Sequence, residues 1–154
     1  MRHILTVALL VLLVLFAAGC LGGGTSGVPF DRPNESDVPS YEVVAQDDQS
    51  FSDDNGKVVQ LTRSVRTTPD AAELTEQQMF AVGKAVIANT ASERELTEIK
   101  VFLYADGVPT GGGACGVVTW APGGEFGNAN KVDPGEYSSH EFVVEQNPVL
   151  CQPV

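Results

Sequence analysis

The order of structural elements is set by one stretch, LTEQQMFAVGKAVIANT, at residues 74–90. Thr75 and Gln78 have the spacing of a capping box, in which each side chain accepts a hydrogen bond from the backbone N–H of the other residue. Apolar residues then recur at helical spacing, namely Met79, Val82, Ala85, Val86 and Ile87. The stretch therefore predicts a largely buried helix that begins after Thr75 and ends at Asn89–Thr90.

Segments of strand character lie on both sides of this helix. The segments before it are a short strand at 41–44, an acidic loop at 47–56 and an alternating strand at 57–67. The segments after it are strands at 98–105, 114–121 and 139–145 and a short edge at 149–154. The order β-β-α-β-β-β predicts an α+β fold, with one helix packed on an antiparallel sheet of about five strands. A β-sandwich with one helix is the alternative.

The N-terminus has the pattern of a secretory signal peptide. Arg2 supplies a positive charge, and residues 4–18 follow without any charged side chain. A charged start, a short apolar run and small residues before a cut site are typical of export signals. The run is shorter than the roughly 20 apolar residues that a membrane-spanning helix needs.

The residues that end this run add a second signal. Ala17-Ala18-Gly19-Cys20 resembles the lipobox of lipoprotein signal peptides. The resemblance implies a signal peptide at residues 1–19, cleaved before Cys20, and a lipid on the Cys20 thiol. Ala17 stands where that family usually has Leu, so an uncleaved N-terminal anchor is the alternative. Both alternatives place the rest of the chain at a cell membrane, facing outside the cytoplasm.

Residues 20–40 are expected to be a flexible linker after the lipidated cysteine. The segment is rich in Gly, Ser and Pro, a composition that buries little apolar surface. Asn34-Glu35-Ser36 within it is a glycosylation sequon, which makes Asn34 a candidate acceptor. The folded extracytoplasmic domain is then expected at residues 41–154.

The charge of the chain excludes one large class of partners. After residue 19, eight Lys and Arg stand against twenty Asp and Glu, a net charge of −12. Such a charge repels polyanions, so nucleic acid is not an expected partner. The acids provide either a binding face for cations and basic partners or a solvated surface suited to high salt. In this respect the chain resembles the lipoproteins of halophilic archaea.

The cysteines predict a crosslink. If Cys20 carries lipid, Cys115 and Cys151 remain. Two thiols in an oxidising compartment predict a disulfide that ties the C-terminal tail to a central strand. Two buried free cysteines are the alternative.

A second resemblance covers most of the folded part. The segments that carry it are Tyr41–Val44, Leu74–Glu76, Val101–Tyr104, Thr119–Gly124 and Tyr137–Glu141. They are similar to those of a small uncharacterised α+β domain of exported bacterial and archaeal proteins. The resemblance implies a fold and no activity.

The segments that resemble catalytic, metal or cofactor motifs are all incomplete. The Gly-rich segment 111–116 lacks the lysine and the following helix of a phosphate loop. The acids of segment 47–55 do not have EF-hand spacing, so a solvated loop is preferred to a calcium site. His140 lies near Ser138, but a Ser–His pair also needs an orienting acid and an oxyanion hole. We therefore expect no catalytic residues, no metal and no cofactor.

The function expected from these patterns is a non-catalytic binding or interaction module, held at the cell surface by its lipid and able to meet a protein partner there. Trp120 and Tyr137 either mark a ligand or partner surface or belong to the core and its rim. Two alternatives remain, an accessory substrate-capture lipoprotein of a transporter and a minor surface hydrolase.

Overall fold

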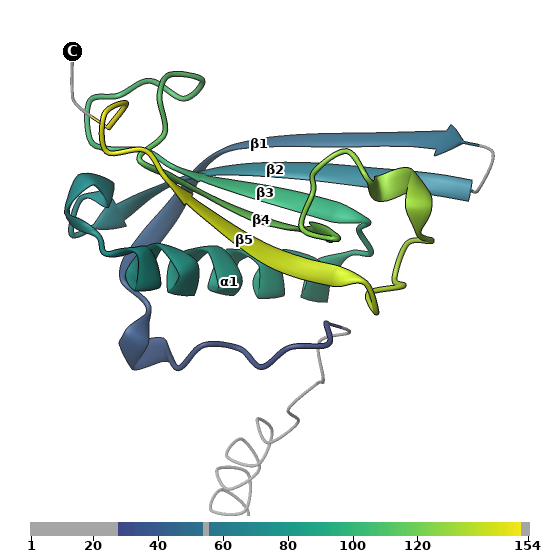
Figure 1. Cartoon of the computed structure of the whole chain (residues 1–154). Helices are drawn as coiled ribbons and strands as arrows, with labels where there is room; N and C mark the ends of the chain where they lie inside the picture. The colour runs from purple at the N-terminus through teal and green to yellow at the C-terminus, as the bar shows by residue number, and fades with distance from the viewer. Residues whose placement is uncertain (1–27, 54–55, 152–154) are drawn as a thin grey trace, which may run out of the picture.

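A computed structural model describes residues 28–53 and 56–151. The expected signal peptide and the lipidation site Cys20 lie outside these residues. The helix is α1 (Glu76–Glu93), and the strands are β1 (Ser40–Asp53), β2 (Gly56–Thr68), β3 (Glu98–Leu103), β4 (Gly116–Pro122) and β5 (His140–Gln146). Figure 1 shows α1 lying along one face of the twisted sheet formed by these strands. The α+β fold and its β-β-α-β-β-β order are confirmed.

The five strands form a single sheet in sequence order, β1-β2-β3-β4-β5. Three neighbouring pairs are antiparallel, as expected. The fourth pair, β2 and β3, is parallel, with Leu61 opposite Ile99 and Val65 opposite Leu103. The parallel pair arises because α1 returns the chain to the end of the sheet at which β2 began. The sheet is thus mostly antiparallel, with one β-α-β crossover.

The start of α1 follows the predicted capping box. Thr75 Oγ1 accepts from the backbone N–H of Gln78, and Gln78 Oε1 accepts from the backbone N–H of Thr75. The end of the helix differs from the prediction, because α1 continues past Thr90 to Glu93. Asn89–Thr90 is only a weak stop signal, and Thr90 Oγ1 donates to the Val86 carbonyl without breaking the helix.

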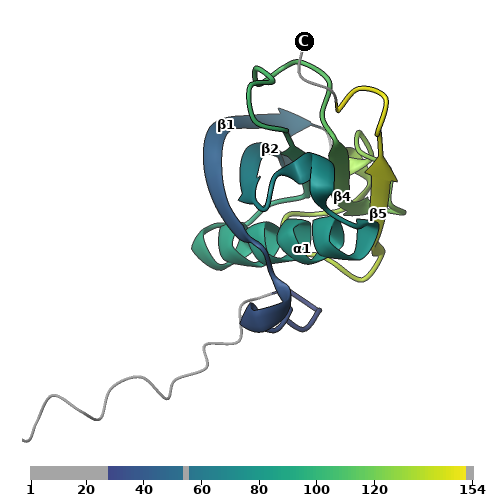
Figure 2. The ribbon, with the colours of Figure 1, turned by 90° about the vertical axis from the view of Figure 1, so that its left-hand side faces the viewer.

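The core fills the space between α1 and one face of the sheet. Leu61, Ile99, Leu103, Val82 and Ile87 are all fully buried there. Near the start of α1, Phe80 packs edge-on against Phe142 of β5, with ring centroids 5.2 Å apart, and just after its end Arg94 pairs with Asp48 of β1. Figure 2 shows β1 curving around this layer toward the segment below the helix.

The expected acidic loop at 47–56 is wrong for residues 47–53, which belong to a strand. Residues 40–53 form one continuous strand that pairs with β2 from Ser40 opposite Thr68 to Asp53 opposite Gly56. The polar composition favoured a loop, but residues 47–53 pair with β2 along one side of their backbone. Within this segment, the Asp48 side chain is also held by ion pairs with Arg63 and Arg94.

Residues 28–39, which we call the strap, belong to the folded part. The expected linker reached to residue 40, yet Val28 is buried and Phe30 packs edge-on against Trp120 and Phe142, with ring centroids 5.3 and 4.9 Å apart. Figure 1 shows the strap running along the side of α1 that faces away from the sheet. Two apolar side chains among Gly and Pro were enough to anchor the segment.

The C-terminal tail is held by the predicted disulfide. Cys115, just before β4, is bonded to Cys151 across a sequence separation of 36 residues. Residues 149–151 do not form the expected edge strand at 149–154, because 149 and 150 lie in a turn that the Leu150 N–H closes by donating to the Asn147 carbonyl. Residues 152–154 lie outside the described part. Gly113 packs against this tail, because a Cβ on it would lie 2.6 Å from Leu150 Cβ.

Candidate functional site

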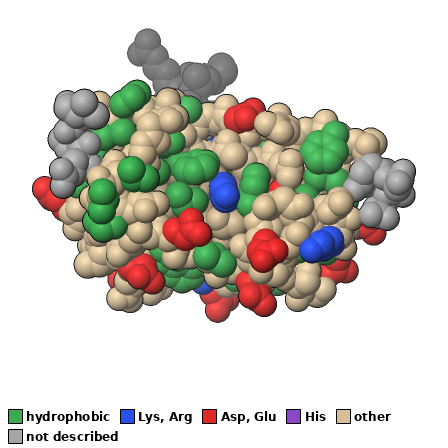
Figure 3. All heavy atoms as spheres, turned by 45° about the horizontal axis from the view of Figure 1, so that its top comes forward, with side chains coloured by type: hydrophobic (Ala, Val, Ile, Leu, Met, Phe, Trp, Pro, Cys, Tyr) green, Lys and Arg blue, Asp and Glu red, His purple; other side chains and the backbone are tan. Residues whose placement is uncertain are grey.

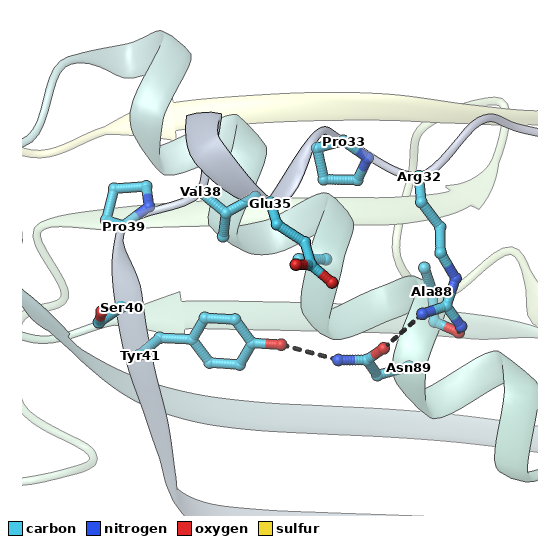
Figure 4. Close-up of a pocket in the computed structure, with 10 residues that line it drawn as sticks. Arg32, Pro33, Glu35, Val38, Pro39, Ser40, Tyr41, Ala88 and Asn89 are labelled. Carbon is cyan, nitrogen blue, oxygen red and sulfur yellow. Dashed lines mark hydrogen bonds between the residues drawn. The ribbon is translucent and has the colours of Figure 1, made fainter. Parts of the chain in front are cut away.

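A pocket of about 540 Å³ lies between the strap and α1. Its walls come from the strap, the start of β1 and one face of the helix, as Figure 4 shows. The polar lining residues are Arg32, Glu35, Ser40, Tyr41 and Asn89, and the apolar ones are Pro33, Val38, Pro39, Ala85 and Ala88. A volume of this size and a mixed lining are typical of small-molecule sites.

Asn89, on the outer side of α1, organises the polar wall. Its Oδ1 accepts a hydrogen bond of 2.9 Å from Arg32 Nη1, and its Nδ2 donates one of 2.8 Å to the hydroxyl of Tyr41. Arg32 also donates to the Ala88 carbonyl across 3.4 Å. One amide thus fixes a side chain from the strap and another from β1 against the helix.

Glu35 faces the same pocket from the short 3-10 helix Glu35–Asp37. Figure 4 shows its carboxylate pointing from the strap toward the space above Tyr41 and Asn89. The turn that carries it is closed by Asn34, whose Nδ2 donates to Asp37 Oδ2 at 3.0 Å and whose carbonyl accepts from the Asp37 backbone N–H. Among the ion pairs within residues 28–53 and 56–151, none joins Glu35 to Arg32.

The pocket therefore offers both signs of charge to a ligand. The Arg32 guanidinium has more N–H groups than its bonds to Asn89 and Ala88 use. The Tyr41 hydroxyl accepts from Asn89, which leaves its own proton to donate. The Glu35 carboxylate supplies acceptors.

His140, the residue considered for hydrolase chemistry, is packed into the structure by its ring. Its Nε2 lies 2.7 Å from the Thr97 carbonyl oxygen, and its Nδ1 is buried with no hydrogen-bond partner among the described residues. The ring centroid lies 4.6 Å from that of Trp120 and 5.2 Å from that of Tyr137. Burial lowers the pKa of His140, although the Thr97 carbonyl and the charge of Glu98 oppose this shift. The geometry pairs His140 with a backbone carbonyl instead of Ser138.

The residues near His140 have structural partners of their own. A hydrogen bond from the Ser138 side chain lowers the pKa of Glu136, and so does the backbone N–H of Ser138, which donates to Glu136 Oε1 at 3.0 Å. Trp120 is buried in the core, and burial raises the pKa of the neighbouring Tyr137. Of the two readings of Trp120 and Tyr137, core and rim positions fit the structure better.

Within the described part of segment 47–55, Asp47 and Asp48 do not converge on a cation site. Asp48 lies between Arg63 and Arg94, while Asp47 accepts from Gln49 Nε2 at 3.2 Å. Asp54 and Asn55 lie outside the described residues. Across residues 28–53 and 56–151, no group of three or more His, Cys, Asp or Glu side chains is placed to hold a metal ion.

The remaining candidate residues also have defined places. Asn34 is exposed on the strap, so the sequon is accessible. The Gly-rich segment 111–116 leads directly into β4, with no helix after it. Figure 3 shows acidic side chains scattered over the surface in view, with fewer basic ones among them.

Sequence reasoning missed the pocket because it assigned Arg32 and Glu35 to a flexible linker. The apolar pair Val28 and Phe30 was the signal that could have placed the strap on the domain. No helix in the described part of the chain is long and apolar enough to cross a membrane. No protein-family model, curated protein or solved structure matches this chain.

Proposed function

We propose that the chain is an exported lipoprotein, attached through Cys20 to the outer face of a membrane, which binds a small molecule without chemically changing it. The ligand site is the pocket between the strap and α1. The observation that carries the binding function is the convergence of Arg32 and Tyr41 on Asn89, opposite the carboxylate of Glu35.

Export is supported by the crosslink between Cys115 and Cys151. Disulfides persist mainly in oxidising compartments, outside the cytoplasm. The net charge of the whole chain is −11, and its acids are scattered over the surface, which suits a medium of high salt where self-repulsion is screened. In this proposal the apolar N-terminal run directs export, and the lipobox-like residues 17–20 provide the site of lipid attachment.

The strap links the proposed anchor to the proposed site. It begins only a few residues after Cys20, and it contributes Arg32, Glu35 and Val38 to the pocket. A domain held in this way presents its pocket close to the membrane surface. This position favours, as a second candidate, an accessory lipoprotein that captures a solute for a transporter.

The anchor is tested by fractionation of cells that express the full chain or the Cys20→Ser variant. We expect the wild-type protein in the membrane fraction and the variant released from it. Equal membrane association of the two would contradict the lipid anchor. Binding is tested separately, by calorimetric titration of the detergent-solubilised protein with the probes described below.

A further inference from the structure

The charges of the pocket limit the ligands that fit it. A simple anion can bind Arg32 but meets the carboxylate of Glu35 and the negative charge of the whole domain. A simple cation can bind Glu35 but meets the guanidinium of Arg32. A ligand that carries both charges avoids either repulsion, because each end faces the opposite charge.

The hydrogen-bond donors and acceptors of the pocket are separated in a way that suits a ligand with one positive and one negative end. Arg32 and the Tyr41 hydroxyl lie at the Asn89 end of the pocket, and both can donate to a carboxylate. Glu35 approaches from the strap, where its oxygens can accept from an ammonium group. Because Asn89 holds Arg32 and Tyr41 in place before a ligand arrives, little side-chain entropy is lost on binding.

The rest of the wall is apolar. Pro33, Val38 and Ala85 form surface that suits an aliphatic side chain. A free amino acid carries a carboxylate, an ammonium group and a side chain on one carbon, and it is small compared with a pocket of about 540 Å³.

Resting on the proposed binding function, we propose that this pocket binds a small zwitterion, an α-amino acid with an apolar side chain. Arg32 and Tyr41 receive its carboxylate, Glu35 receives its ammonium group, and the strap covers its side chain.

The test is calorimetric titration of the solubilised full chain with three probes that differ in one group. L-Leucine carries both charges, L-leucinamide lacks the carboxylate, and N-acetyl-L-leucine lacks the ammonium group. We expect leucine to bind, and each derivative to bind at least tenfold more weakly. L-Alanine is titrated in parallel, so that the size of the side chain is controlled.

Two variants assign the charges to residues. Arg32→Gln should remove the preference for leucine over leucinamide, and Glu35→Gln should remove the preference for leucine over N-acetyl-leucine. Both side chains are exposed, so the fold should persist, which urea unfolding checks. Matched controls are Glu73→Gln, in another short 3-10 helix, and Lys131→Gln, both away from the pocket.

The outcomes separate the two proposals. If a derivative binds as tightly as leucine and Arg32→Gln or Glu35→Gln weakens it, the pocket is a binding site but the zwitterion proposal is wrong. If neither amino acid nor either derivative binds at millimolar concentration, the zwitterion proposal is overturned, whereas the wider proposal that the pocket binds a small molecule does not depend on these probes. If leucine binds equally to wild type and both pocket variants, binding occurs elsewhere and the proposal also fails.

Discussion

Gly83 of α1 lies so close to Val118 of β4 that a Cβ atom on the glycine would lie 2.4 Å from the Val118 Cβ. The helix backbone therefore rests directly on the centre of the sheet. All three of the nearest atoms belong to the Val118 side chain, which is fully buried and cannot turn away.

Gly83→Ala should destabilise the protein even though alanine is the better helix former. Overpacking a core typically costs about 1–3 kcal/mol, which exceeds the gain of about 1 kcal/mol in helix propensity. Urea unfolding measures the difference. The control is Gln77→Ala on the exposed side of α1, which should change the free energy of unfolding by less than about 0.5 kcal/mol. A Gly83→Ala variant more stable than wild type would show that the contact is looser than described.

Asp48→Asn should weaken the junction between the β1–β2 hairpin and the end of α1. Asp48 bonds the buried Arg63 and, at 2.6 Å, Arg94, so its loss leaves a buried guanidinium without a counter-charge. Breaking a fully buried pair costs about 3–5 kcal/mol, and the 33% exposure of the Asp48 side chain reduces this to about 2 kcal/mol.

Asp47→Asn is the matched control for this change. Asp47 is the neighbouring acid and is exposed, so its loss should alter the free energy of unfolding by less than about 0.5 kcal/mol. Equal effects of the two substitutions in urea unfolding would mean that the ion pairs of Asp48 add nothing to stability.

If Cys20 carries a lipid as proposed, the disulfide between Cys115 and Cys151 should leave no free thiol in the mature protein. Thiol titration of the denatured, unreduced protein should give none, and reduction should release two. The Cys115→Ser variant should expose one thiol and lower the free energy of unfolding by up to about 4 kcal/mol, the chain-entropy value for a loop of this length. Two reactive thiols before reduction would refute the crosslink.

Stability should fall as the pH drops below about 6.5, the ordinary pKa of histidine. Burial lowers the pKa of His140 in the folded protein, so the unfolded chain binds this proton more readily. The contribution of His140 to the free energy of unfolding is complete above the pKa that this residue has in the unfolded chain. It is lost as the pH falls toward the lower pKa that the residue has in the folded protein. The attraction of Glu98 and Glu136 limits the effect.

Urea midpoints at pH 7.5 and 5.5 measure this contribution. The wild-type midpoint should fall more than that of His140→Gln, which lacks the titrating ring but retains a donor for the Thr97 carbonyl. Carboxylates titrate in both proteins and cancel in the comparison. An identical pH dependence in the two would contradict the assignment to His140.

The parts of the fold that local sequence could predict are those whose partners are nearby in the chain. Thr75 and Gln78 are three residues apart, and their reciprocal bonds define the start of α1. Strand patterns likewise depend only on neighbouring residues. Alternation identified β2, β3 and β5, and an apolar run identified β4, with small errors at their ends. The parallel pairing of β2 with β3 follows from tertiary packing around α1, which no local pattern encodes.

The candidate site was beyond prediction for the same reason. The local sequence around Asp48 predicts an acidic loop, because its partner Arg94 is 46 residues away in the chain. The local sequence around Arg32 predicts a linker, because its partner Asn89 is 57 residues away in the chain. The composition of the strap favours disorder, but the packing of Phe30 on Trp120 overrides that preference.

The most direct test of a lipid-anchored module outside the cytoplasm is the mass of the N-terminal peptide from membrane-extracted protein. We expect that peptide to begin at Cys20 and to carry the added mass of a lipid, with residues 1–19 removed. An N-terminus that still begins at Met1, or a Cys20 of unmodified mass, would contradict the anchor.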